Sequence, residues 1–173
     1  PWTPPFEHLL AFPDDMYRAE ILHSDTQTAR LAAALERTDR LDRTHMIVTS
    51  DHGEGLGEHG EHSHAYFAYE STLRVPLVVW SGAEVGEPGR EGRTVPGSVW
   101  IDDIAPTLAE LAGLEPWTSP ARSLLPAMDG DALPTRRLGI ECVQPANSYG
   151  TAPVFGVIDE AGIAWYDLPH HER

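Results

Sequence analysis

Apolar residues recur along the chain at spacings that predict an alternation of helices and strands. Between residues 15 and 37 they return at roughly helical intervals, which predicts an amphipathic helix. Short apolar runs predict strands at 45–50 and 75–81, and the first of these is apolar enough to suggest a buried strand. A further helical pattern follows Asp102-Asp103 and ends at Gly113, a residue suited to terminate a helix.

The remaining segments carry patterns of a different kind. Four prolines in residues 1–13 predict an extended segment, and residues 82–97 and 115–134 are polar enough to predict loops. Three short apolar runs then predict strands at the end of the chain. A mixed or antiparallel sheet therefore follows the α/β part, with strands expected at 136–143, 153–159 and 162–166.

The chain is organised around residues 46–77, where polarity changes abruptly. The apolar run ends at Val48, the polar residues Thr49-Ser50 come next, and Asp51-His52-Gly53 follows directly. Open α/β sheets commonly build ligand sites at such strand ends, and carboxylate and imidazole groups are both good metal ligands. Glycine lets the backbone turn away directly after the two side chains. These residues predict either a metal site or a turn with a solvated carboxylate.

Four histidines within thirteen residues raise a second possibility for this loop, a zinc cluster. The spacing of His52, His59, His62 and His64 matches no common zinc arrangement, and no cysteine lies nearby. We therefore do not expect a structural zinc site here.

Taken together, several short motifs resemble the sulfatase family of the alkaline phosphatase superfamily. The resemblance covers residues 14–128 and implies the C-terminal part of a sulfatase-like α/β domain. The fold class it implies is α/β, part of an alkaline phosphatase-like sandwich, with residues 129–173 forming a small, mostly antiparallel sheet region. The motifs are YRAEI at 17–21 with Asp25, TSDHGE at 49–54, LGEHG at 56–60, YE at 69–70, RVPL at 74–77 and DDIAPTL at 102–108.

The same resemblance implies a chemistry, hydrolysis of sulfate monoesters with one divalent metal and a formylglycine nucleophile. Asp51 and His52 match the family's metal-ligand pair. The resemblance favours Ca²⁺, whereas the imidazole itself would favour Mn²⁺ or Zn²⁺. A Lys or His shortly before the Tyr69-Glu70 position contacts the sulfate or the leaving group in the family. His64 is our candidate for this catalytic and substrate-binding role, and His62 is the second choice.

One essential part of the family pattern is missing from these 173 residues. No Cys/Ser-x-Pro-x-Arg motif is present, and residues 118–122 (TSPAR) match its spacing only by chance because they follow the metal pair. The family's N-terminal paired aspartates are also missing. We therefore expect the C-terminal portion of a metal-dependent sulfatase, inactive by itself, whose partners are a sulfate ester and the N-terminal half of the same protein. The alternatives are a phosphodiesterase or phosphonate hydrolase of the same superfamily, or a non-catalytic binding module.

The amino-acid composition restricts the kinds of partner that we expect. The chain has 27 acidic and 12 basic residues, a net charge of −15, and all the basic residues are arginine. This charge disfavours nucleic acid and anionic membranes, and an anionic substrate would need local positive charge such as a metal ion. No apolar run approaches the ~18 residues needed to span a bilayer. The single cysteine, Cys142, leaves the compartment open between bacterial cytoplasm and periplasm.

Overall fold

The computed structural model describes residues 3–64, 66–82, 92–115, 119–159 and 161–166. The chain divides into two compact units, one of residues 1–48 and 78–91 and the other of residues 49–77 and 92–173. Parts of the predicted loops at 82–97 and 115–134 lie outside the described residues. Among the described helices, none is long and apolar enough to cross a membrane.

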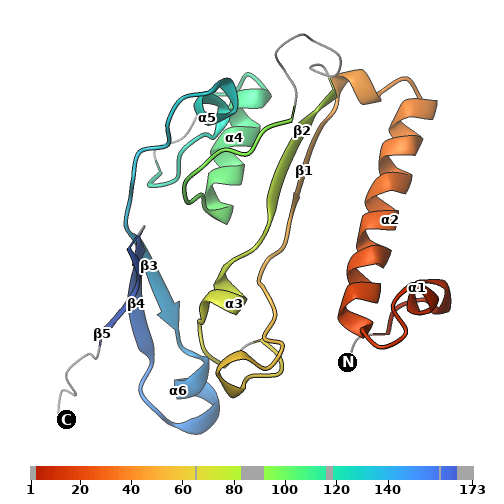
Figure 1. Cartoon of the computed structure of the whole chain (residues 1–173). Coiled ribbons are helices and arrows are strands. Elements are labelled where there is room, and N and C mark those ends of the chain that lie inside the picture. Colours follow the sequence, from red (N-terminus) through yellow and green to blue (C-terminus); the bar gives the residue numbers. More distant parts are fainter. Residues whose placement is uncertain (1–2, 65, 83–91, 116–118, 160, 167–173) are drawn as a thin grey trace. The chain divides into compact units, whose positions relative to one another are not determined.

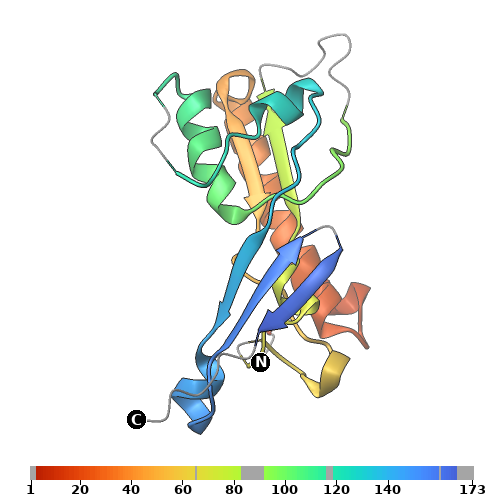
Figure 2. The same cartoon turned by 90° about the vertical axis from the view of Figure 1, so that its left-hand side faces the viewer.

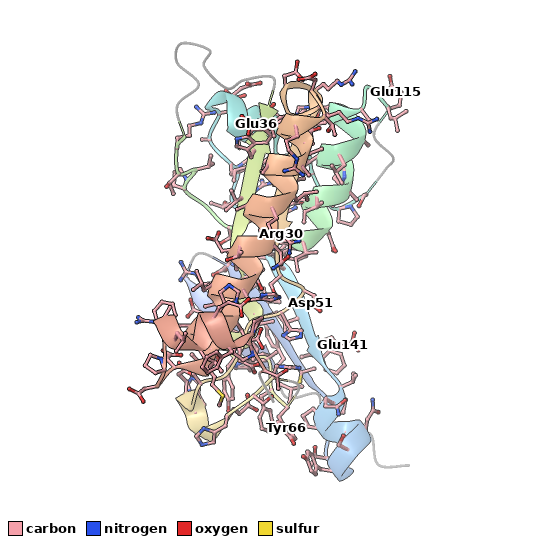
Figure 3. The ribbon with its side chains drawn as sticks, turned by 90° about the vertical axis from the view of Figure 1, so that its right-hand side faces the viewer. Arg30, Glu36, Asp51, Tyr66, Glu115 and Glu141 are labelled. Atoms are coloured by element: carbon pink, nitrogen blue, oxygen red, sulfur yellow. The ribbon has the colours of Figure 1, made fainter. Side chains whose placement is uncertain are left out.

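The first unit is built on a long helix, α2 (Met16–Arg37), which confirms the amphipathic helix predicted from the sequence. Asp15 caps it, because its carboxylate accepts a hydrogen bond from the Arg18 amide at 3.0 Å. Its polar side chains include Arg30 and Glu36 (Figure 3). The 3-10 helix η1 (Leu41–Arg43) follows and leads to the first strand.

A short helix, α1 (Phe6–Ala11), lies where we predicted an extended segment. That prediction was wrong for this part of residues 1–13, and the prolines explain why. Pro5 stands at the N-cap, where the missing N–H costs nothing, and Glu7 in the first turn suits the helix dipole. Pro13 comes directly after the C-cap residue Phe12, a place where helices commonly end.

The strands β1 (His45–Thr49) and β2 (Leu77–Ser81) form a two-stranded sheet and lie side by side (Figure 1). Their positions agree with the predicted strands. The prediction that the first strand is buried was wrong, because no residue of β1 is fully buried and Val48 is 40% exposed. In the described residues only β2 pairs with β1, so its apolar side chains have little to pack against.

In the second unit, helices and a sheet follow one another along the chain. The loop after β1 contains η2 (Glu58–Gly60) and α3 (Glu70–Leu73). Further on, η4 (Ile101–Asp103) runs into α4 (Ile104–Leu111), which confirms the predicted second helix. We predicted a loop at 115–134, but it contains α5 (Leu125–Asp129), which has a proline at its start and left-handed Gly130 at its end.

The expected antiparallel sheet closes the second unit (Figure 2). Its strand order is β3-β4-β5, and both pairs are antiparallel, with Ile140 opposite Gly156 and Gly156 opposite Trp165. The sequence did not predict α6 (Gln144–Tyr149), the short helix that joins the first two strands. The strands are β3 (Leu138–Cys142), β4 (Val154–Asp159) and β5 (Gly162–Tyr166).

A buried carboxylate, that of Asp103, links separate segments of the second unit. Its side chain is completely buried and forms an ion pair with Arg136. It also accepts hydrogen bonds from the backbone amides of Trp100 at 3.0 Å and Arg122 at 2.9 Å. The neighbouring Thr107, also fully buried, donates to the Asp103 carbonyl and accepts from the Leu124 amide. Buried polar groups satisfied in this way fix the segments around them.

Candidate functional site

The loop after β1 carries the predicted site and is fixed by close backbone packing. The Gly53 amide donates to the Thr72 carbonyl at 2.8 Å. A Cβ atom at Gly53 would lie only 2.1 Å from the Ser71 carbonyl oxygen, so this position needs glycine for the close approach of two backbone segments. The loop therefore returns against α3, and the residues on either side of Gly53 are held in place.

Asp51, labelled in Figure 3, and His52 are the predicted metal ligands and lie together at the start of this loop. His52 Nε2 is 3.8 Å from Asp51 Oδ1, and the Asp51 side chain is 86% exposed. His52 Nδ1 lies 2.8 Å from the Gly53 carbonyl oxygen, which can only accept. Nδ1 must therefore donate, and in the neutral ring Nε2 keeps its lone pair for a ligand.

The chemistry and spacing of this pair fit a cation. Metal ligands stand about 2.0–2.6 Å from the ion, so two atoms 3.8 Å apart can share one. Anchoring of the second ring nitrogen to a backbone carbonyl is also typical of metal-binding histidines. In the described part of the chain, no group of three or more His, Cys, Asp or Glu side chains could hold a metal ion together. The assignment of Asp51 and His52 as ligands stays a prediction.

His64, the predicted catalytic residue, lies beside this pair. Its ring centroid is 4.0 Å from that of His52, at an interplanar angle of 31°. Its Nδ1 is 3.1 Å and 3.3 Å from the two carboxylate oxygens of Glu54. Because a carboxylate only accepts, Nδ1 donates and Nε2 is available for a substrate. The structure thus brings Asp51, His52 and His64 into one group.

Glu54 is the member of this group that sequence reasoning missed. Its side chain is only 14% exposed, and it orients the imidazole of His64 from ten residues away. The signal available was its place two residues after His52 in the Asp-His-Gly-Glu motif. Nothing in that spacing says which histidine it meets, because the loop between Glu54 and His64 decides the pairing.

The other histidines of the loop take different positions. His62 lies near Gly57 and lines a pocket together with His59. The ring of His59 stacks on Tyr69 at a centroid distance of 4.1 Å. Glu58, the residue before His59, has an exposed carboxyl group. Hydrogen bonds from the backbone amides of Glu58 and Leu56 lower the pKa of this carboxyl. These contacts shape the loop.

Comparison with known proteins identifies the family of the chain. The family model described as Sulfatase matches residues 13–114, more than half of the chain. The human iduronate 2-sulfatase is 32% identical over 57% of this chain and 22% of its own length. The choline-sulfatase of Rhizobium meliloti is 38% identical over 66% of this chain and 22% of its own length. The chain therefore spans about a fifth of these curated relatives.

Solved structures of related proteins show which fold this chain shares. The phosphonate monoester hydrolase of Agrobacterium radiobacter is 26% identical and superposes with a TM-score of 0.66, covering 88% of this chain and 34% of its own. This likeness places the chain among the alkaline phosphatase-like α/β folds. With the family match over residues 13–114, the chain belongs to the sulfatase family.

Proposed function

We propose that this chain is the C-terminal portion of a metal-dependent hydrolase of sulfate monoesters. The observation that carries the proposal is the grouping of His64 with Glu54 at 3.1 Å and with His52 at 4.0 Å, next to Asp51. In this arrangement the two candidate metal ligands, Asp51 and His52, lie beside the oriented imidazole of His64. The printed names of the relatives, iduronate 2-sulfatase and choline-sulfatase, support sulfate esters as the substrate class.

Asp51 and His52 would hold the divalent cation through Oδ1 and Nε2. A cation held there would bind the ester's sulfate oxygens and neutralise their charge. Ca²⁺ is the ion we favour, with Mn²⁺ and Zn²⁺ as the alternatives that an imidazole ligand suits. Two ligands are few for a hard cation, so the remaining ligands would come from other parts of the protein.

His64 would act as the acid at the leaving oxygen. Its Nδ1–H is held by Glu54, so the Nε2–H of the protonated ring would point in one defined direction. As the bond between sulfur and the ester oxygen breaks, that oxygen would take the Nε2 proton and leave as the alcohol. His62 is the alternative for this role or for binding the sulfate, and it lies two residues before His64 in the same loop.

The nucleophile would come from a part of the protein outside these 173 residues. The chain lacks a Cys/Ser-x-Pro-x-Arg motif and spans about a fifth of its relatives. Many of its large apolar side chains are exposed, among them Phe6 at 72% and Leu10 at 68%. Both facts support an N-terminal half of the same protein as the main partner. The chain alone should therefore be inactive.

A second candidate function is hydrolysis of a phosphonate or phosphate ester. It is favoured by the similarity to a phosphonate monoester hydrolase, at 26% identity and a TM-score of 0.66. Sulfate and phosphonate monoesters are both anions that a cation and a proton donor can serve. A non-catalytic module on the same scaffold is the third possibility, and it predicts no turnover of any ester.

The deciding experiment compares the complete protein with this chain. The gene's upstream sequence should contain a Cys/Ser-x-Pro-x-Arg motif. The complete protein should release the phenol from a chromogenic aryl sulfate, and a chelator should stop the reaction. A preference for the aryl phosphonate would favour the second function, and inactivity on all esters would favour the module. Chelator-sensitive turnover by the 173-residue chain alone would contradict the proposed partnership.

A further inference from the structure

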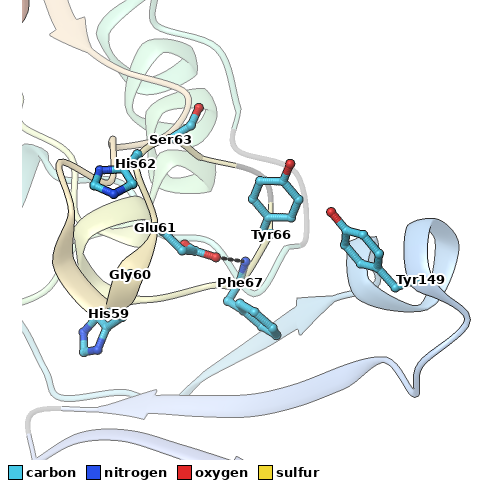
Figure 4. Close-up of a pocket in the computed structure, with 8 residues that line it drawn as sticks. All are labelled: His59, Gly60, Glu61, His62, Ser63, Tyr66, Phe67 and Tyr149. Carbon is cyan, nitrogen blue, oxygen red and sulfur yellow. Dashed lines mark hydrogen bonds between the residues drawn. The ribbon is translucent and has the colours of Figure 1, made fainter.

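A second feature of the same loop is a pocket of about 470 Å³ that includes none of Asp51, His52 and His64 (Figure 4). It is formed by the loop residues before α3 and by Tyr149 at the end of α6, all within the second unit. Its lining combines a carboxylate with aromatic rings. The lining residues are His59, Gly60, Glu61, His62, Ser63, Tyr66, Phe67 and Tyr149.

Glu61 is the charged residue of this pocket, and it is nine-tenths buried. Its Oε1 accepts a hydrogen bond from the Phe67 amide at 3.1 Å (Figure 4). Its Oε2 is buried without a hydrogen-bond partner, and the carboxylate forms no ion pair with any residue that the structure describes. A buried charge is costly unless an opposite charge compensates it. The pocket therefore has in its wall a buried carboxyl group with one oxygen that has no hydrogen-bond partner.

Aromatic rings form the other side of the pocket. Tyr66 and Tyr149 face each other in a stacked arrangement, with ring centroids 5.9 Å apart (Figure 4). The Cys142 thiol donates to the Tyr66 carbonyl at 3.3 Å, which helps to hold this segment near the sheet. A hydrogen bond with Tyr66, together with desolvation, raises the pKa of the Tyr149 hydroxyl. The face of a neutral tyrosine ring carries the negative side of its quadrupole.

We propose that this pocket binds an organic ammonium cation, with a quaternary ammonium group as the best match. Aromatic faces attract such cations within about 6 Å, and quaternary groups need no hydrogen-bond acceptor. The Glu61 carboxylate attracts the same charge from inside the wall, where a low dielectric strengthens the attraction. An anionic ligand would meet repulsion from Glu61 and from the net charge of −15. The proposal does not depend on ester hydrolysis.

The test is a titration of the 173-residue chain with tetramethylammonium chloride at constant ionic strength, set with sodium chloride. Neutral tert-butanol, similar in size, is titrated in parallel. We expect saturable shifts of the Tyr66 and Tyr149 ring signals in NMR spectra with the cation and none that saturate with the alcohol. Equal responses to the two probes would show that the pocket selects shape alone, and would overturn the proposal.

Variants assign the binding to the pocket. Glu61→Gln keeps the oxygen that accepts from the Phe67 amide and removes the charge, so binding should weaken about fivefold or more. Tyr149→Ala should weaken it similarly, whereas Tyr149→Phe keeps the ring and should bind like the wild type. Tyr166→Ala, at an exposed strand residue, is the control. Wild-type affinity in both Glu61→Gln and Tyr149→Ala would refute the site. If Glu61→Gln does not fold, the Tyr149 pair decides.

Discussion

At the scale of single residues, the main feature of the loop is that its hydrogen bonds orient the imidazole rings of His64 and His52. Glu54 accepts a hydrogen bond from the Nδ1–H of the His64 ring and leaves Nε2 as the nitrogen that can meet a substrate. His52 is oriented in the same way, because the Gly53 carbonyl accepts a hydrogen bond from its Nδ1–H. Both imidazoles therefore present Nε2 for function, one toward a cation and one toward a leaving group in the proposed mechanism.

This arrangement predicts the effect of two substitutions in the complete enzyme. His64→Ala should lower turnover roughly 10²- to 10⁴-fold, the usual contribution of a positioned acid. Glu54→Gln keeps an oxygen acceptor for Nδ1–H but removes one of the two carboxylate oxygens that orient the ring. It should therefore cost less, about 10- to 100-fold, as for other residues that orient a functional histidine.

Steady-state kinetics with a chromogenic ester, together with circular dichroism to check folding, would measure both effects. His62→Ala is the matched control on the same loop. Turnover of His64→Ala within a few-fold of the wild type would remove the acid role from this residue. A large loss in His62→Ala instead would transfer that role to His62.

At the scale of elements, the helical part of the second unit depends on one of two adjacent aspartates. Asp103 is fully buried and has partners on three segments, whereas Asp102 is exposed. The two carboxylates follow each other in the sequence but differ in solvent exposure. The 3-10 turn η4 gives them opposite environments.

We expect Asp103→Ala to destabilise the second unit by about 3–5 kcal/mol, because it leaves the Arg136 guanidinium and two backbone amides without their partner. Asp102→Ala, the matched control, should change stability by no more than about 0.5 kcal/mol. Urea unfolding followed by far-ultraviolet circular dichroism would measure the difference. Equal stabilities of the two variants would show that the buried ion pair contributes nothing net.

At the scale of the whole molecule, the chain buries little apolar surface for its length. In the described residues the buried apolar side chains other than proline are Ala19, Ala109, Leu124, Ala127 and Leu138. Many large apolar side chains are exposed instead, including Met16 and Leu31 on α2. A surface of this kind suits contact with further protein. It agrees with the proposed N-terminal partner.

The same incompleteness predicts weak metal binding by the chain alone. Asp51 and His52 supply two ligands, whereas Ca²⁺ takes about 6–8 oxygens. A ligand stabilises a fold by RT ln(1 + [L]/Kd), so a weak site at millimolar metal gives almost no shift of the melting temperature. Thermal melts with Ca²⁺, Mn²⁺ or chelator should nearly coincide. A large stabilisation that disappears in Asp51→Ala would mean that this chain completes its own metal site.

The sequence by itself determined the elements whose signals are local. The helical spacing of residues 15–37 predicted α2, and the apolar runs predicted the strands of the terminal sheet close to their observed bounds. Local chemistry likewise placed Asp51 and His52 together, since adjacent residues at a strand end cannot separate. The family resemblance added His64, which the structure brings to the same group.

Tertiary structure decided what depends on residues far apart in the chain. The pairing of Glu54 with His64, and of Asp103 with Arg136 across 33 positions, follows from how loops return, which no local spacing encodes. Burial is decided in the same way. The apolar run of β1 predicted a buried strand, but burial depends on which segments cover it, and in the described residues only β2 pairs with β1. Glu61 is the converse case, a charged residue that becomes buried because the loop folds over it.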